Sequence, residues 1–290
     1  MYAHQVIDDL IKSLKKNSGN KKIEDHIKIF IKEIYQSQKF HLGDVDSLNA
    51  LDKMAGKKLF NEENVCELKT PYEKMWIDWQ HSDKSKIKNG DTHVPVRGSL
   101  VVLVNNLYLN IIPFLKIDGL WCPEFIIHNI YYDKTLKLNI SKPAYPEYMP
   151  DLLGPRFEQW WRITKYESCQ ELTVINIFML IMSCKNIIKI KKNPSVKLNK
   201  KRKKSGKLPI FEYHTLEIKP KKEQEKSVHQ GLWNNRVHLC RGHFKTYTEK
   251  NPLFGNVTGR FWWQPSIRGN KNKGIVIKDY NVGGLIRSEK

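Results

Sequence analysis

Cysteine pairs are missing from this sequence, and their absence excludes two classes of small domain. Only five cysteines occur in 290 residues, and no two of them stand in a CxxC pair. An odd, scattered set argues against a disulfide framework and against a zinc ribbon, and is typical of a protein from a reducing cytoplasm. We therefore expect neither a metal ion nor another cofactor.

A leader and a long apolar run are also missing. Residues 1–10 lack the basic and apolar regions of a signal peptide. The most apolar run, 172–184, is interrupted by Thr173 and Asn176 and is too short to span a bilayer. The sequence predicts a cytoplasmic protein with no membrane segment, in the cytoplasm of the host cell if a phage encodes it.

Acidic residues are too few to balance the basic ones. The chain has 50 Lys and Arg against 30 Asp and Glu, a formal net charge of +20. A field of this sign attracts polyanions, so RNA, a ribosome-associated nascent chain or an acidic protein is the expected partner. The alternative is a Lys- and Ile-rich composition that follows an AT-rich genome.

Hydrophobic periodicity predicts an α+β fold. Apolar residues recur at helical spacing near the N-terminus, with a third helix beginning at Asp46 or Ser47. Short β-type runs follow, and a mainly helical stretch over 157–192 comes after them. The regions are a helical N-terminal region (1–66), a β-meander plus helix (67–192), a basic linker (193–207) and a basic-aromatic domain with a small antiparallel sheet (208–290).

Acids are absent from the most basic part of the chain. Residues 185–207 hold eleven cations and no carboxylate. A like-charge run repels itself, so it predicts a mobile arm that would release counterions on a phosphate backbone. A solvated linker without a partner is the alternative. The densest part of this basic arm is Lys200, Lys201, Arg202, Lys203 and Lys204.

A second acid-poor stretch near the C-terminus combines cations with histidines and aromatic residues. Between residues 231 and 274 there are eight cations, and Glu249 is the only carboxylate. Unpaired guanidinium groups suit phosphate or carboxylate, and aromatic faces suit bases. The candidate binding residues are Arg236, His238, Arg241, His243, Lys245, Tyr247, Arg260, Trp262, Trp263 and Arg268.

If 236–247 is one strand, alternation places His238 and His243 on opposite faces. Gly242 weakens the middle of that strand and often marks a bulge, at which the faces would switch. A bulge would bring the two histidines and Arg241 closer together.

Three chemistries can use these groups. Metal binding lacks a standard ligand set, because the spacing of His238 and His243 around one cysteine matches no common site. Cleavage of RNA without metal needs a base, an acid and a cation, for which His238, His243 and Lys245 are the catalytic candidates. Recognition without catalysis needs only cations and stacking surfaces. A basic, solvated sheet with a tryptophan core remains the structural alternative.

The same stretch resembles a known family. Arg241, Gly242 and His243 followed by the aromatic Phe244, and then Trp263, Gln264 and Pro265, resemble the C-terminal signature of a type V-A anti-CRISPR inhibitor that suppresses biosynthesis of its nuclease target. The resemblance covers 236–268. It implies a phage or mobile-element protein that recognises a nascent N-terminal peptide and causes loss of the corresponding mRNA.

These observations leave three hypotheses. The first is a regulatory protein that binds RNA, a nascent chain or both through the C-terminal surface and the basic arm. The second is a metal-independent ribonuclease that uses His238 and His243. The third is a protein–protein inhibitor that binds an acidic partner without nucleic acid.

Overall fold

The structure is a computed structural model that describes residues 1–16, 20–45, 70–81, 96–105, 108–132, 138–140, 143–167, 169–218, 236–240, 243–263, 266–268 and 270–275. The chain divides into two compact units, Met1–Lys219 and Pro220–Lys290. The third helix predicted from Asp46 or Ser47 lies outside the described residues.

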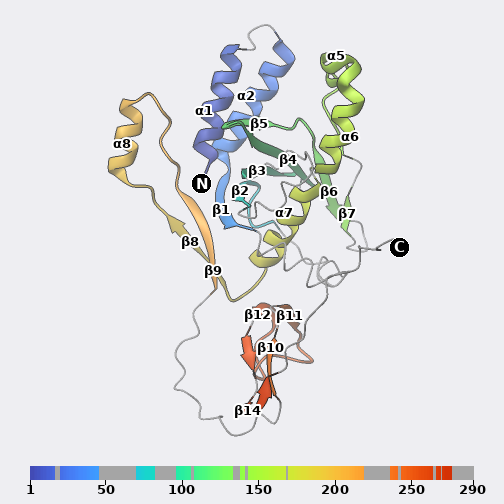
Figure 1. The fold of residues 1–290 in the computed structure, drawn as a ribbon, viewed down its shortest axis with the longest axis vertical. Coiled ribbons are helices and arrows are strands. Elements are labelled where there is room, and N and C mark those ends of the chain that lie inside the picture. The colour runs from blue at the N-terminus through green and yellow to red at the C-terminus, as the bar shows by residue number, and fades with distance from the viewer. Residues whose placement is uncertain are drawn as a thin grey trace, which may run out of the picture. The chain divides into compact units, whose positions relative to one another are not determined.

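The first unit combines helices with one large sheet (Figure 1). Its helices are α1 (Ala3–Lys16), α2 (Lys21–Gln36), α5 (Met149–Leu153), the short 3₁₀ turn Gly154–Arg156, α6 (Phe157–Glu167), α7 (Cys169–Met182) and α8 (Val196–Lys204). Its strands are β1 (Gln38–Asp44), β2 (Lys74–Gln80), β3 (Val96–Val104), β4 (Tyr108–Ile117), β5 (Leu120–Pro123), β6 (His128–Tyr132), β7 (Leu138–Ile140), β8 (Ile187–Lys192) and β9 (Tyr213–Ile218).

Nine strands of the described chain form this sheet, in the order β7-β6-β4-β3-β2-β1-β9-β8 with β5 beside β4. The antiparallel pairs from β2 through β3, β4 and β6 to β7 confirm the predicted meander. β1 departs from it, because it pairs in parallel with both β2 and β9. The result is the α+β fold that the sequence predicts.

Helices α1 and α2 cover one face of the sheet. Leu10 and Phe30 are buried with Trp76 and Phe114, which come from β2 and β4. The rings of Phe30 and Phe114 meet edge to face with centroids 5.6 Å apart. Both helices are amphipathic, so this contact removes their apolar stripes from water.

Helix α7 lies against the opposite face. Phe40 of β1 points away from Trp76, because it is paired with Ile77 in the register and side chains alternate along a strand. The Phe40 ring lies 5.0 Å from that of Phe178 in α7. Arg97 of β3 also donates to Glu171 of α7 at 2.5 Å, and both side chains are buried. Removal of either partner would leave a buried charge, so this pair fixes how α7 sits on the sheet.

The region from 187 to 218 differs from the prediction. The helix expected to reach residue 192 ends at Met182, and residues 187–192 form strand β8. Residues 196–204, inside the predicted linker, form helix α8. Residues 213–218, assigned in the prediction to the C-terminal domain, form β9 and pair with β8 along its length. Strand β9 therefore belongs to the large sheet of the first unit and not to a separate C-terminal domain.

The second unit contains short strands in two small sheets. They are β10 (Arg236–Cys240), β11 (His243–Tyr247), β12 (Gly259–Trp263), β13 (Ser266–Arg268) and β14 (Asn270–Ile275). β10 pairs antiparallel with β13 and parallel with β14, whereas β11 pairs antiparallel with β12. The continuous strand expected over 236–247 is therefore two strands in different sheets, and residues 241 and 242 between them lie outside the described chain.

No helix in the described ranges is both long and apolar enough to cross a membrane.

Candidate nucleic-acid interface

Helix α8 begins and ends at local sequence signals. The Ser195 hydroxyl accepts the Leu198 N–H at 3.4 Å as an N-cap. At the other end, Gly206 has a φ of +67°, which glycine adopts without steric cost. The Gly206 N–H donates to Lys203 O at 3.1 Å, and the Lys207 N–H donates to Arg202 O at 3.0 Å. These bonds form a Schellman motif, so the helix has a defined stop.

The inner face of α8 is fixed to the rest of the first unit. Asn199 Nδ2 donates to Ile210 O at 3.0 Å, and Asn199 Oδ1 accepts from Ile210 N at 2.8 Å. Arg202 Nε donates to Leu208 O at 2.8 Å, and Arg202 Nη2 lies 3.5 Å from Asp8 Oδ2 in α1. Asp8 Oδ1 also accepts the Leu208 N–H at 3.3 Å. Of the basic arm predicted to be mobile, residues 187–192 form strand β8 and residues 196–204 form a helix held by side-chain hydrogen bonds.

The outer face of α8 presents the remaining cations to solvent. Lys197, Lys200, Lys201 and Lys204 follow at helical spacing on one stripe, and Lys203 and Lys207 flank it. All six are exposed, and none forms an ion pair within the described part of the chain. Cations near a helix C-terminus stabilise it by at most about 1 kcal/mol each at an exposed site. That effect explains why lysines occur in the last turn of α8, but it gives no reason for Lys197 and Lys200, which lie before that turn.

In the second unit, the β11–β12 hairpin combines cationic and aromatic side chains. Lys245 is opposite Phe261 in the register, and its Nζ lies 4.8 Å from the centre of the Tyr247 ring. The Tyr247 and Phe261 rings meet edge to face at 5.8 Å. Lys245 is exposed, while the two rings are partly buried, so this face offers an ammonium group beside aromatic surface.

The other face of the hairpin is more enclosed. Trp262 is opposite Phe244, with ring centroids 4.7 Å apart. Arg260 is only 3% exposed. A guanidinium at that depth is poorly placed for phosphate at the surface, which corrects the surface role expected for Arg260. Trp263, which is partly buried, pairs with His243 in the register and alternates onto the face that carries Lys245 and Phe261.

The turn between these strands contains an exposed aromatic residue that was not among the predicted site residues. Phe254 is 85% exposed and has a φ of +52°. Positive φ is a rare, strained conformation for a bulky residue. The turn is closed by Leu253 and Val257, whose backbone N–H groups each donate to the other's carbonyl, at 2.7 and 3.0 Å. A defined turn therefore holds the Phe254 ring in solvent.

The other predicted residues of this unit are located only by their strands. Arg236 and His238 belong to β10, and His238 is paired with Arg268 of β13. Arg241 and the side chain of His243 lie outside what the structure describes. Since β10 and β11 belong to different sheets, the register does not place His238 and His243 side by side. Within the described residues, no group of three His, Cys, Asp or Glu could hold a metal ion.

A buried carboxylate forms a further polar site. Asp78 of β2 lies opposite His41 in the parallel register with β1, and its Oδ1 accepts from His41 Nδ1 at 2.6 Å. Asp78 Oδ2 accepts from Trp76 Nε1 and from the Tyr2 N–H, both at 2.8 Å. The ammonium of Met1 lies 3.7 Å from Oδ1. Asp78 thus ties the start of α1 to β1 and β2. In the sequence His41 and Asp78 are isolated, and only strand pairing brings them together.

Several titratable groups of the first unit have shifted pKa values with structural causes. Burial lowers the pKa of His4 to about 4, with a smaller contribution from the positive charge of Arg202. Burial also lowers the pKa of Lys39 to about 8. Lys39 Nζ donates to the carbonyls of Tyr35 and Ser37 at 3.0 and 2.7 Å, so it caps the end of α2. His128 is 1% exposed, as expected for a core histidine, and burial lowers its pKa to about 4.

Comparisons of the chain with protein-family models, curated proteins and solved structures give no match. The function must therefore be inferred from the geometry of the side chains. Two surfaces stand out: the cationic outer face of α8 in the first unit, and the hairpin with Lys245 and Phe254 in the second.

Proposed function

We propose that the protein binds single-stranded RNA, with the α8 lysines contacting the phosphate backbone. The observation that carries the proposal is a set of six exposed lysines, five on the docked helix α8 and Lys207 just after it, that have no acidic partner among the described residues. Because their positions are already fixed, little backbone ordering is needed on binding. Each phosphate neutralised releases condensed counterions, which favours binding at low salt.

The hairpin of the second unit supports a single strand over a duplex. Phe254 and the partly exposed rings beside Lys245 can stack on unpaired bases, and stacking is worth about 1–3 kcal/mol per base. A base in a duplex is already stacked and offers no free face. Arg260 is left out of this proposed surface because it is buried.

The regulatory role belongs to the same proposal. A phage or mobile-element protein that resembles the anti-CRISPR family would act on an mRNA in the cytoplasm, and RNA binding would bring it there. Support for that part is the resemblance over 236–268 alone. Recognition of a nascent peptide by the same C-terminal surface stays a prediction.

The test is binding of a labelled RNA oligonucleotide, by fluorescence anisotropy, over a KCl series. The first variant replaces Lys197, Lys200, Lys201 and Lys204 with Gln, and the control replaces Lys189, Lys191 and Lys192 of β8, which is one charge fewer, with Gln. The α8 variant should bind about 100-fold more weakly at low salt, and its log–log salt slope should be shallower by about 3. The β8 variant should change far less, because its lysines already have partners.

Three results would overturn the proposal. The first is that the wild-type protein does not bind RNA at low salt. The second is that the two lysine variants weaken binding equally. The third is that polyglutamate competes for binding as well as RNA does. The last result would indicate an acidic protein partner. Duplex RNA of the same sequence should bind less tightly than the single strand, and cleavage of the labelled RNA would reinstate the ribonuclease hypothesis.

A further inference from the structure

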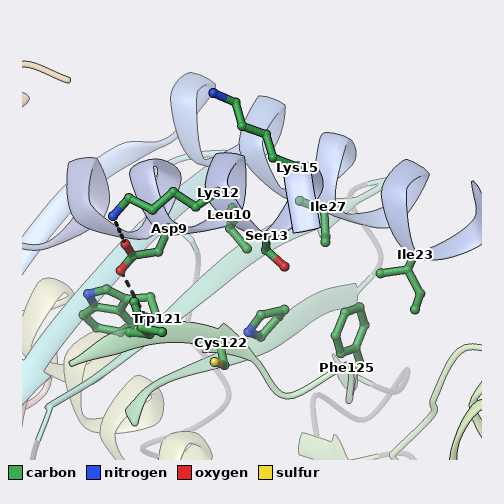
Figure 2. A pocket seen from close by; sticks show the side chains of 12 residues that line it. Asp9, Leu10, Lys12, Ser13, Lys15, Ile23, Ile27, Trp121, Cys122 and Phe125 are labelled. Carbon is green, nitrogen blue, oxygen red and sulfur yellow. Dashed lines mark hydrogen bonds and ion pairs between the residues drawn. The ribbon is translucent and has the colours of Figure 1, made fainter. Parts of the chain in front are cut away.

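A pocket lies between the N-terminal helices and strand β5, away from the α8 lysines. Its volume is about 590 Å³, within the range typical of small-molecule sites. Figure 2 shows α1 on one side and β5 on the other, with Ile23 and Ile27 of α2 beside Phe125. Seven of the twelve lining residues have apolar side chains, so the interior favours a hydrocarbon group.

Local structure fixes the positions of the two walls relative to each other. Asp118 and Gly119 have φ values of +49° and +81°, the pattern of a tight hairpin turn, and this turn brings β5 back along β4. The Trp121 N–H then donates to Asp9 Oδ2 of α1 at 3.2 Å. Phe125, just after β5, has a φ of +52° and carries its ring to the wall of the pocket. Strain at a bulky residue beside a pocket often accompanies ligand binding.

The charges at the rim favour an anion. Asp9 Oδ1 accepts from Lys12 Nζ at 2.8 Å and its other oxygen accepts from Trp121, so both oxygens of the carboxylate are engaged. Lys15 is exposed and has no ion pair among the described residues. The residues that line the pocket therefore carry one cation in excess, Lys15, whose ammonium points away from β5 in Figure 2 and whose flexible side chain would turn towards the pocket to meet the head of a bound molecule.

Covalent capture by the nearby thiol is disfavoured. The Cys122 sulfur points away from α1 in Figure 2. Burial raises the pKa of this thiol, which keeps it protonated at neutral pH.

We propose that this pocket binds a single-chain carboxylate of the fatty-acid class, with the alkyl chain between α1, α2 and β5 and the carboxylate near Lys15. Two features support this ligand class: an apolar interior of adequate volume, and a lining lysine without an ion pair among the described residues whose side chain can turn towards the opening. This proposal is independent of RNA binding.

The experiment measures displacement of fluorescent cis-parinarate from the full chain by dodecanoate and by dodecan-1-ol, below their micelle concentrations. Ser13 points from α1 towards β5 in Figure 2, so Ser13→Phe should fill the space and weaken both ligands by at least about tenfold. Lys15→Glu should weaken dodecanoate by about fivefold and leave dodecanol unchanged. Lys32→Glu, an exposed lysine of α2 outside the pocket lining, is the matched control and should change neither.

Several outcomes decide against the site. Wild-type protein that shows no saturable displacement overturns it, and so does a Ser13→Phe protein with a native circular dichroism spectrum and unchanged affinity. If Lys15→Glu and Lys32→Glu weaken dodecanoate binding equally, Lys15 does not contact the carboxylate and that part of the proposal is wrong. If Ser13→Phe does not fold, the ratio of dodecanoate to dodecanol affinity in Lys15→Glu decides. Co-sedimentation with phosphatidylcholine vesicles, without displacement by monomeric dodecanoate, would indicate a membrane surface and refute a fatty-acid pocket.

Discussion

Strand β8 and helix α8 are neighbours in the sequence and equally rich in lysine, yet their lysines are in different situations. On β8, Lys189 Nζ donates to the Tyr72 hydroxyl at 2.8 Å, and Lys191 lies 2.8 Å from Glu212. Lys192 lies 3.7 Å from Glu217. The outward lysines of α8 have no acid beside them in the described chain.

This difference separates lysines with a structural role from those available to a partner. β8 is an edge strand of the sheet, and lysines on an edge discourage pairing with another chain. Its acidic partners are Glu212, just before β9, and Glu217 within β9, both on the far side of α8 in the sequence. Both elements are rich in cations and neither contains an acid, so the three-dimensional pairing is what distinguishes their lysines.

The largest expected effect is a change with pH in the stability of the unit to which α8 is attached. Arg202, the inward cation of α8, contributes to the lowered pKa of the buried His4. The unfolded chain binds a proton at His4 near pH 6.5, whereas the folded chain binds it only near pH 4. Stability from the neutral imidazole is therefore complete above pH 6.5 and is lost as pH falls to 4, by roughly 2–3 kcal/mol.

Urea unfolding between neutral pH and pH 4.5 measures this loss. His4→Gln should flatten the dependence of the unfolding free energy on pH. A His4→Gln protein with the wild-type pH slope would show that protonation of His4 does not loosen the unit that carries α8.

The next effect asks whether charge alone explains RNA affinity. Phe254→Ala removes the exposed ring and leaves every cation in place, so RNA should bind about tenfold more weakly with an unchanged salt slope. Lys250→Gln in the same turn is the control, and it should instead make the salt slope shallower by about 0.7. If Phe254→Ala binds RNA as the wild type does, the hairpin takes no part and the α8 lysines act without it.

The antiparallel part of the sheet could be predicted because its signals are local. Apolar runs of strand length, separated by short turns, led directly to the meander from β2 to β7. The Asp118–Gly119 turn carries an equally local signal, since such a pair between apolar runs marks a tight hairpin, but no strand was expected at β5. The parallel pairing of β1 with β9 could not be inferred, because it joins residues 40 and 214 and leaves no local pattern.

The sequence predicted the positive charge of the candidate site but not the secondary structure that carries it. The α8 lysines were expected as a mobile arm because a like-charge run repels itself. Ser195 as an N-cap and Gly206 as a stop were visible in the sequence, but the hydrogen bonds of Asn199 and Arg202 that fix the helix depend on segments it packs against. Burial of Arg260 and exposure of Phe254 likewise follow from how the hairpin packs, which composition does not reveal.

The smallest expected effect comes from removing the carboxylates that pair with the β8 lysines, which leaves these lysines available to RNA. A hydrogen bond from Lys191 lowers the pKa of the Glu212 carboxyl and outweighs the opposing effect of desolvation, so the carboxylate is charged at neutral pH and competes with phosphate for that lysine. Glu212→Gln with Glu217→Gln should raise RNA affinity by about threefold, and exposed pairs of this kind cost little stability when broken.

Asp151→Asn with Glu158→Gln changes the net charge equally at exposed positions of α5 and α6. If both double variants raise RNA affinity by the same factor, total charge governs binding and the pairing of individual lysines does not. A gain confined to the β9 variant would show that partnered lysines become binding lysines once their carboxylates are removed.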